Sequence, residues 1–379
     1  MLTNALVIAQ SDLSDNGRDA TIYTIFNIKI DQTATNVTAA RDAALINGQR
    51  LALERLFRRI ILISDRPKLP EFSNNQIMEL ISGYEINDER RSGVRYIASL
   101  IVHFNRSKIH EILSEYQIPY AETLGIAVSI LPVFEDGATL TLWEKANHWR
   151  LAWKDYDVSN NLVPINTPEP TLKNRMYINA LQAKSDNQTN IQTFIEQNKL
   201  NELIIATATI KKDMVNNQAL LTINLKRNTQ IETDTNSQTD ITVSAPLYDE
   251  IGDLNLNTLY LKGIDASTDW IDDLWKSKVL VNYGVASKIR ASGTLNDLND
   301  WLIMEKQLKK VNLVRNVNLL AITINTVNLE IEFAGDSEQL ALSLAQQGLK
   351  LNQDKDQNWL LTINEYAASQ GLNRQGIDQ

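Results

Sequence analysis

Three tryptophans, Trp143, Trp149 and Trp153, stand close together in the chain and are the first residues whose type could support binding. A helix is predicted over Leu142–Tyr156. On that helix Trp149 and Trp153 share one face, whereas Trp143 lies about 120° from Trp149 around the axis. Exposed indoles would form a platform for sugar rings or for a partner chain, and buried ones would belong to a core. We take the three tryptophans as candidate partner-binding residues.

A second candidate surface is the charged turn between the apolar runs Leu80–Asn87 and Val94–Phe104. Acidic and basic side chains occur together there, an arrangement that either solvates a turn or contacts a protein partner. Carboxylates in such a turn could also bind a cation or bridge to arginines. The candidate residues are Glu85, Asp88, Glu89, Arg90, Arg91 and Tyr96.

The residues that usually carry catalysis are scarce. The chain has three histidines and no cysteine, which excludes disulfides, thiolate metal sites and cysteine nucleophiles. Glu144 and His148 have the spacing of a metal-ligand or acid/base pair, but the nearby sequence offers no further ligand. His103, in a predicted strand, and His110, in a predicted helix, are interpreted as structural.

Motifs that bind phosphate or activate a nucleophile are also missing. We find no phosphate-binding glycine loop, no nucleophile elbow and no zinc-protease helix in the sequence. A catalytic triad is assembled in space and leaves no such motif, and nothing in the sequence points to one. We therefore expect a non-catalytic protein with no catalytic residue, no cofactor and no metal site.

Composition limits the remaining classes of function. With 379 residues, 43% of them hydrophobic, the chain is long enough for two or three domains. The net charge of −9 argues against nucleic-acid binding. No apolar run approaches the ~18 residues of a membrane span, which leaves peripheral membrane contact open.

The first predicted domain covers residues 19–124 and is an α+β unit of order β-α-β-β-α. Its long helix has small residues in the first half and bulky residues in the second, so it can approach a sheet closely at one end and fill a core at the other. Thr35 or Asn36 is expected to cap this helix. The predicted elements are Thr21–Ile30, Val37–Ile60, Leu80–Asn87, Val94–Phe104 and Lys108–Tyr116.

The second predicted domain, residues 125–277, alternates helices and strands, which favours an α/β domain with a partly parallel sheet. Residues 229–240 are polar and are expected to form an exposed hairpin tip. The predicted strands are Ile126–Phe134, Glu202–Ile210 and Ala219–Lys226, and the predicted helices are Leu142–Tyr156, Asn190–Asn198 and Leu256–Ser277.

The third predicted domain, residues 278–364, has the βαββαβ order of a ferredoxin-like split fold. Thr294 is expected to cap its first helix and Gly348 to end its second. Residues 365–379 are read as a flexible tail, and residues 1–18 as a signal remnant or flexible tail. The predicted elements are Val279–Ala291, Leu295–Lys310, Val314–Ile324, Val327–Phe333, Ser337–Gln347, Leu349–Asn352 and Trp359–Ile363.

Several short motifs resemble an uncharacterised family of bacterial envelope proteins, the domain of unknown function 2066. The motifs occur in Ala39–Arg59, Gly83–Tyr96, Leu131–Val133, Leu142–Glu144 and His148–Trp153. The resemblance implies export to the periplasm and supplies no catalytic residues. A weaker likeness, in domain order alone, is to the flagellar-ring assembly protein of sodium-driven motors.

The sequence therefore predicts a multidomain α+β and α/β protein with a binding or scaffolding role and a protein partner in the bacterial cell envelope. Assembly of an envelope or flagellar complex is one form this role could take. The alternative is a hydrolase or carbohydrate-binding protein that acts on cell-wall sugars. A periplasmic location is expected, with the cytoplasm as the alternative.

Overall fold

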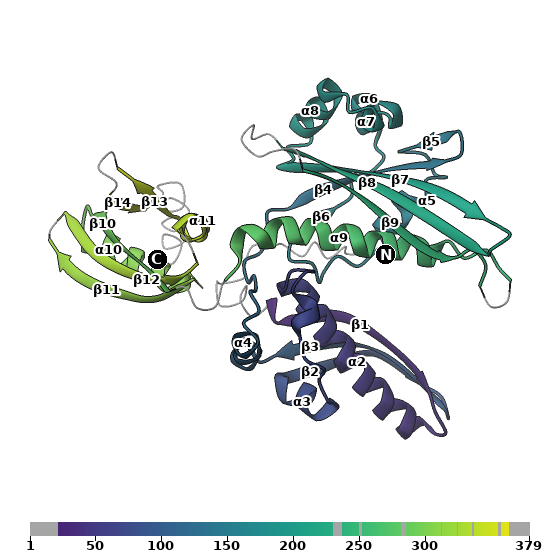
Figure 1. Ribbon diagram of the computed structural model, residues 1–379, viewed down its shortest axis with the longest axis horizontal. Coiled ribbons are helices and arrows are strands. Elements are labelled where there is room, and N and C mark those ends of the chain that lie inside the picture. The colour runs from purple at the N-terminus through teal and green to yellow at the C-terminus, as the bar shows by residue number, and fades with distance from the viewer. Residues whose placement is uncertain are drawn as a thin grey trace, which may run out of the picture. The chain divides into compact units, whose positions relative to one another are not determined.

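The computed structural model describes residues 22–229, 237–249, 252–281, 286–311, 313–323, 325–335, 337–354 and 358–363 (Figure 1). The predictions for residues 1–18, for 365–379 and for most of the 229–240 turn lie outside these ranges. Within them the chain is a mixture of helices and sheets, which confirms the α+β class. Its contacts form two compact units, Met1–Thr123 with Lys276–Gln379, and Leu124–Trp275.

The N-terminal sheet is antiparallel, with strand order β1-β3-β2. Helix α2 crosses one of its faces (Figure 1). This helix has the predicted bounds, and Asn36 caps it by accepting a hydrogen bond from the backbone N–H of Ala39 at 2.9 Å. The elements are β1 (Thr24–Thr33), α2 (Val37–Ile60), β2 (Ile81–Arg91) and β3 (Arg95–Phe104).

Helix α2 approaches the sheet most closely at Gly48. A Cβ atom at this position would lie 2.7 Å from Ile30 Cγ2 and 2.7 Å from Leu100 Cδ1. The small residues Ala40 and Ala44 precede it on the same buried side. The prediction that small side chains let the helix approach a sheet agrees with this contact.

Three short helical segments complete this part of the chain, and only one of them is predicted from the sequence. Helix α4 begins two residues before the predicted start because Asn105 caps it. Helix α3 was missed, although Ser73 and Gln76 form a capping box at its start. The segments are η1 (Arg66–Lys68), α3 (Asn74–Leu80) and α4 (Arg106–Glu115).

The second unit contains a 6-stranded sheet of order β5-β4-β7-β8-β9, with β6 paired to β4. Strand β4 runs parallel to β6 and β7, and the remaining pairs are antiparallel. The strands are β4 (Val128–Asp136), β5 (Thr139–Thr141), β6 (Ile165–Asn166), β7 (Glu202–Asp213), β8 (Gln218–Thr229) and β9 (Gln238–Pro246).

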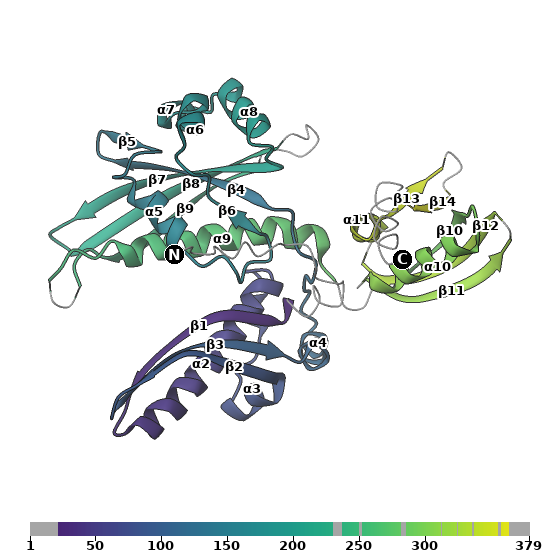
Figure 2. The same cartoon turned by 180° about the vertical axis from the view of Figure 1, so that it is seen from behind.

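Helices cover both faces of this sheet, as Figures 1 and 2 show. Alternate residues of β7 enter different cores: Ile204 and Ala206 belong to one hydrophobic cluster, whereas Leu203 and Ile205 belong to another. The helices are α5 (His148–Asp155), α6 (Leu172–Tyr177), α7 (Ala180–Lys184), α8 (Gln188–Gln197) and α9 (Asn257–Val279).

The predicted helix Leu142–Tyr156 is wrong in its first part, because α5 begins only at His148. The side chain of Asn147 donates to the carbonyl oxygens of Pro132, Thr141 and Leu142, and it accepts from the backbone N–H of Arg150. These bonds hold the preceding residues in a turn and cap the helix at the same point.

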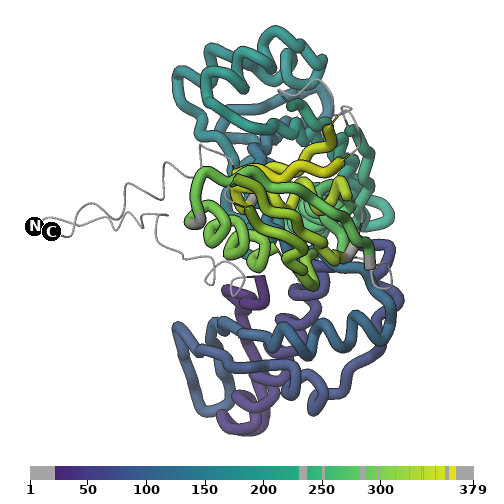
Figure 3. The backbone as a smooth tube through the Cα atoms, turned by 90° about the vertical axis from the view of Figure 1, so that its left-hand side faces the viewer, coloured from purple at the N-terminus to yellow at the C-terminus, as the bar shows by residue number. Residues whose placement is uncertain are grey.

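The C-terminal segment forms a 5-stranded sheet of order β11-β12-β10-β14-β13, the green to yellow part of the tube in Figure 3. Strand β14 is parallel to β10 and the other pairs are antiparallel. The elements are β10 (Ala286–Thr294), α10 (Leu298–Lys310), β11 (Val314–Ile322), β12 (Thr326–Ala334), α11 (Ser337–Gln346), β13 (Leu349–Gln353) and β14 (Trp359–Ile363).

Two predicted boundaries are corrected here. The strand expected from Val279 begins only at Ala286, because Val279 is the last residue of α9. The cap of α10 is Asp297 and not Thr294, and it accepts from the backbone N–H of Asp300 at 3.0 Å. Gly348 follows α11 with φ +78°, as expected for a residue that ends a helix.

Candidate functional site

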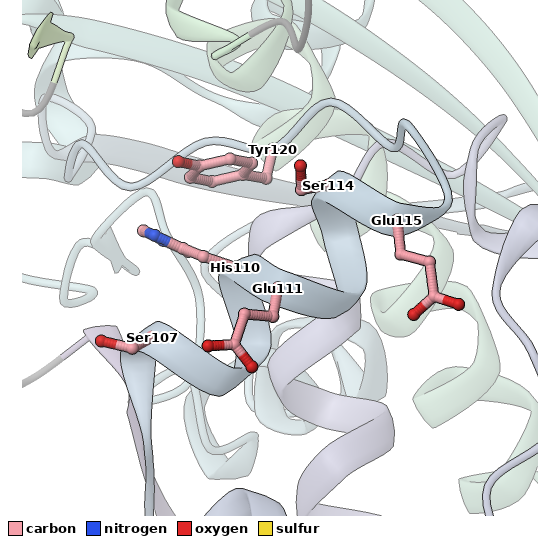
Figure 4. Close-up of a pocket in the computed structure, with 6 residues that line it drawn as sticks. All are labelled: Ser107, His110, Glu111, Ser114, Glu115 and Tyr120. Carbon is pink, nitrogen blue, oxygen red and sulfur yellow. The ribbon is translucent and has the colours of Figure 1, made fainter.

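An open cavity of about 630 Å³ lies along one side of α4 (Figure 4). Both serines, the histidine and both glutamates come from α4, and the tyrosine comes from the segment that follows it. Hydroxyl, imidazole and carboxylate groups therefore share one concave surface. The lining residues are Ser107, His110, Glu111, Ser114, Glu115 and Tyr120.

Helical periodicity explains why these polar side chains line one wall. Ser107 and Ser114 are three residues before and four residues after His110, so all three share a face of α4. The buried residues Ile109 and Leu113 anchor a neighbouring face of the helix. The Tyr120 ring closes over the imidazole, with a distance of 4.7 Å between the ring centroids.

Beneath the cavity, His110 belongs to a polar cluster around the buried carboxylate of Glu122, which is 3% exposed. Tyr23 donates its hydroxyl hydrogen to Glu122 Oε1, and His110 Nε2 bonds the same oxygen. The Tyr23 hydroxyl also lies 2.8 Å from His110 Nε2. Arg106 donates from Nη2 to the other oxygen, Oε2, at 2.6 Å.

These contacts determine the ionisation of the cluster. Burial acts to raise the pKa of Glu122, but the hydrogen bond from His110 and the charge of Arg106 outweigh it, so the pKa falls below 4.5. Burial raises the pKa of Tyr23 well above 10.0, and the charge of Glu122 raises it further. At neutral pH the cluster therefore contains a carboxylate and a neutral phenol.

The cluster has two chemical possibilities. A histidine oriented by a carboxylate beside hydroxyl groups is the arrangement that activates a nucleophile. The same bonds also tie together the start of β1, helix α4 and the segment at Glu122, which is a structural task. Among the residues that the structure describes, no group of three or more His, Cys, Asp or Glu side chains is placed to hold a metal ion.

The tryptophans predicted to form a platform are buried. Trp143 and Trp149 donate their indole N–H groups to the carbonyl oxygens of Ile178 at 2.7 Å and Ala206 at 3.0 Å. Trp143 belongs to one core cluster, whereas Trp149 and Trp153 belong to the other. The exposed-platform hypothesis is therefore wrong, because all three rings are at most 3% exposed.

The charged residues predicted to form a turn lie on the surface, with one exception, but the turn itself is shorter than predicted because β2 continues to Arg91. Glu85, Asp88, Glu89, Arg90 and Arg91 are all exposed on β2. Glu85 lies 3.3 Å from His103 Nε2, and Asp88 adopts a left-handed backbone with φ +53° where the register of β2 against β3 shifts.

Tyr96 is the exception, because its side chain is fully buried. Burial raises the pKa of its hydroxyl, and the nearby Glu89 raises it further. The ring lies 6.0 Å from the guanidinium carbon of Arg41 on α2. Tyr96 therefore belongs to the packing of the hairpin and not to a surface that a partner could contact.

From the sequence, His110 is expected to have a structural role, and no sequence feature singles out Tyr23, Arg106, Tyr120 or Glu122. Tyr23 and Glu122 are separated by 99 positions in the sequence, so no local motif links them. The one local signal is the spacing of Arg106 and His110, which places them on one side of a helix.

No family of known proteins matches the chain, and no curated protein matches it either. One similar structure is the lipoprotein GNA1162 of Neisseria meningitidis, with 10% identity, a TM-score of 0.26, and coverage of 39% of this chain and 97% of that one. Another is a formyltetrahydrofolate deformylase of Pseudomonas putida KT2440, with 10% identity, a TM-score of 0.15, and coverage of 67% and 92%.

Within the described ranges, no helix has the length and the apolar composition that crossing a bilayer requires.

Proposed function

We propose that this chain is a non-catalytic binding or scaffolding protein of the bacterial envelope, resident in the periplasm, that contacts a protein partner during assembly of an envelope or flagellar complex. The observation that carries the binding role is the hairpin of β2 and β3. Every residue from 87 to 95, its distal part, is exposed. The envelope setting rests on the sequence resemblance.

The hairpin is held in place before a partner arrives. Arg95 forms a two-bond ion pair with Asp31 on β1, with Nε to Oδ1 at 2.8 Å and Nη2 to Oδ2 at 2.6 Å. Behind the tip, Tyr96 is buried against the domain. A fixed hairpin loses less conformational entropy on binding than a free loop, which favours recognition.

The charges in the distal part of the hairpin suit selective contact with another protein. Asp88 and Glu89 adjoin Arg90 and Arg91, so both signs are presented over a short distance. Among the described residues, β2 pairs with β3 alone, which leaves its outer edge open. Mixed charges at an interface select partners by complementarity and penalise wrong pairings.

Photo-crosslinking in cells tests this proposal. A photoreactive amino acid replaces Glu89 at the hairpin tip, and the matched control carries it at Val215, which is 93% exposed in the turn between β7 and β8. We expect one discrete product from the Glu89 position and none from Val215. Equal labelling at both positions, or none at either, would contradict the hairpin as a binding surface. Fractionation of the same cells tests periplasmic residence.

The second candidate function is a hydrolase that acts on cell-wall sugars. It is favoured by one observation: His110 shares an open cavity with Ser107 and Ser114 and bonds the carboxylate of Glu122, which is buried beneath that cavity. Turnover of a panel of chromogenic glycosides and esters tests it. Activity that His110→Gln abolishes and Glu111→Gln retains would replace our proposal with this one.

The scaffold proposal also includes a modular layout. We interpret residues 278–364 as a ferredoxin-like module that is separate in function from the first domain. The order of β10, α10, β11, β12 and α11 supports this interpretation. Expression of residues 278–364 alone, followed by a test for cooperative unfolding, decides it: a non-cooperative transition would show that the segment depends on the rest of the chain.

A further inference from the structure

We infer that strand β11 and helix α10 form a docking groove for an extended peptide with alternating apolar side chains and acidic side chains at its C-terminal end. This surface is distinct from the β2–β3 hairpin and does not depend on it. Among the described residues, β11 pairs only with β12 and forms an edge of its sheet (Figure 1).

The groove is a cavity of about 390 Å³ between the helix and the edge strand. Trp301, Glu305 and Lys309 follow one another at four-residue steps, so they form a single row along α10 that faces β11. The strand contributes the other wall. Its lining residues are Val314, Arg315, Asn316, Val317 and Leu319.

The strand register shows that the groove lies on the core-facing side of the sheet. Val317 is opposite Ile331, and Leu319 is opposite Leu329. Ile331 and Leu329 are fully buried in the core, so Val317 and Leu319 point to that same side. Leu319 is nevertheless 48% exposed. The apolar face of the sheet therefore extends beyond the part that α10 covers.

An added strand would cover this face. Between the irregularities at Val314/Asn316 and at Leu319/Ala321, residues 316–319 pair regularly with β12. On an edge strand, alternate residues present their N–H and C=O groups outward, where an extended peptide can bond them. Every second peptide side chain would then pack on Leu319 and Trp301, which is the pattern of strand-addition recognition.

Charge indicates the chemistry of the peptide. Arg315 is exposed at the start of β11 and Lys309 lines the groove beside it, although the whole chain has a net charge of −9. The only acidic lining residue in the described groove, Glu305, lies 2.6 Å from the Lys309 Nζ. An antiparallel peptide would place its C-terminal end at Arg315, so acidic side chains belong at that end.

The test measures fluorescence anisotropy of labelled peptides on the full chain. One probe alternates valine and threonine and ends in two aspartates and a C-terminal amide. Its companion ends in two lysines instead. We expect the aspartate probe to bind at least tenfold more tightly than the lysine probe, because only the first complements Arg315.

Two variants and two matched controls locate the binding. Leu319→Ser should weaken binding of the aspartate probe about fivefold or more. Leu360→Ser, at another exposed leucine of the same sheet, should leave that affinity unchanged. Arg315→Glu should reverse the preference between the two probes, whereas Arg290→Glu, at an exposed arginine on β10, should leave it unchanged. Both changes in the groove are at exposed side chains, so the fold is expected to survive them.

Other outcomes overturn the inference. Equal affinity for the two probes would show that the site does not select acidic peptides. An affinity for the aspartate probe that Leu319→Ser leaves unchanged would place the binding site elsewhere. Self-association that Leu319→Ser abolishes, without peptide binding, would make a second copy of the chain the occupant. Because the Glu89 crosslink reads a different surface, the groove and the hairpin proposals can fail separately.

Discussion

The carboxylate of Glu122 is expected to hold α4 in place, and Glu122→Gln removes its charge while keeping its size. Losing one partner from a fully buried ion pair costs about 3–5 kcal/mol. Here the side chain of Arg106 is 41% exposed and regains water when the pair is lost. We therefore expect the free energy of local unfolding to fall by about 2–3 kcal/mol.

Part of this cost comes from lost hydrogen bonds. Tyr23 and Arg106 donate to different oxygens of Glu122. A glutamine offers one oxygen and one NH₂ group, so it can no longer accept from both Tyr23 and Arg106. An unsatisfied donor in a buried site costs about 1–3 kcal/mol, which is already part of the range above.

The pH dependence has a defined sign. In the folded protein the pKa of Glu122 lies below its ordinary value of 4.5. Its stabilisation is therefore present above pH 4.5 and is lost as the pH falls through the folded pKa, because the unfolded chain then binds the proton more readily. The stability difference between the native protein and Glu122→Gln should shrink over that acidic window.

Hydrogen exchange with mass spectrometry is the suitable assay. The first tryptophan in the sequence is Trp143, so β1 and α4 contain no tryptophan whose fluorescence could report on them. Exchange in peptides from β1 and α4 gives the local opening free energy directly. The control is Glu111→Gln at an exposed residue of the same helix, with an expected change within about 0.5 kcal/mol. Equal values for the two variants would refute the reasoning.

Three further predictions concern packing and buried polar groups. Gly48→Val should destabilise the fold by about 2–3 kcal/mol in urea unfolding, despite a better helix propensity, because its side chain would meet Ile30 and Leu100; an unchanged midpoint would contradict the close approach. Burial and the charge of Asp136 raise the pKa of Tyr260 to about 12. The fold should therefore lose stability between pH 10 and 12, and Tyr260→Phe should flatten that slope in circular dichroism titrations. Lys276→Met removes the Nζ bonds to the carbonyl oxygens of Arg58 and Ile61 at 2.8 and 3.0 Å, and exchange near the end of α2 should show a loss of about 1–3 kcal/mol; native protection there would argue against it.

Sequence patterns predicted helices and strands well where caps, apolar periodicity or polar turns within a few residues determine them. The bounds of Val37–Ile60 were correct because Asn36 supplies a cap and the apolar period runs without a break to Ile60. The strands around residues 88–93 were placed correctly within a few positions for the same kind of reason. Alternation of apolar residues and a polar turn needs no knowledge of the rest of the chain.

The errors arose where distant segments decide the outcome. Asn147 bonds to Pro132, which lies on a different element, and these bonds stop a helix that the composition of residues 142–147 favours. Trp143 and Trp149 are six positions apart but enter cores on different faces of a sheet. Spacing alone could not show whether the rings face solvent, because exposure depends on what packs against them.

The sequence by itself determined the α+β class, the long helix α2 and the exposed charges of the hairpin, because propensity, capping and periodicity act over a few residues. Only the tertiary structure decided that the tryptophans are buried, and that Tyr23, Arg106, His110 and Glu122 meet beneath one cavity. The hydrogen-bond partners of a buried carboxylate come from whichever segments the fold brings within bonding distance. That proximity cannot be predicted from any local stretch of the chain.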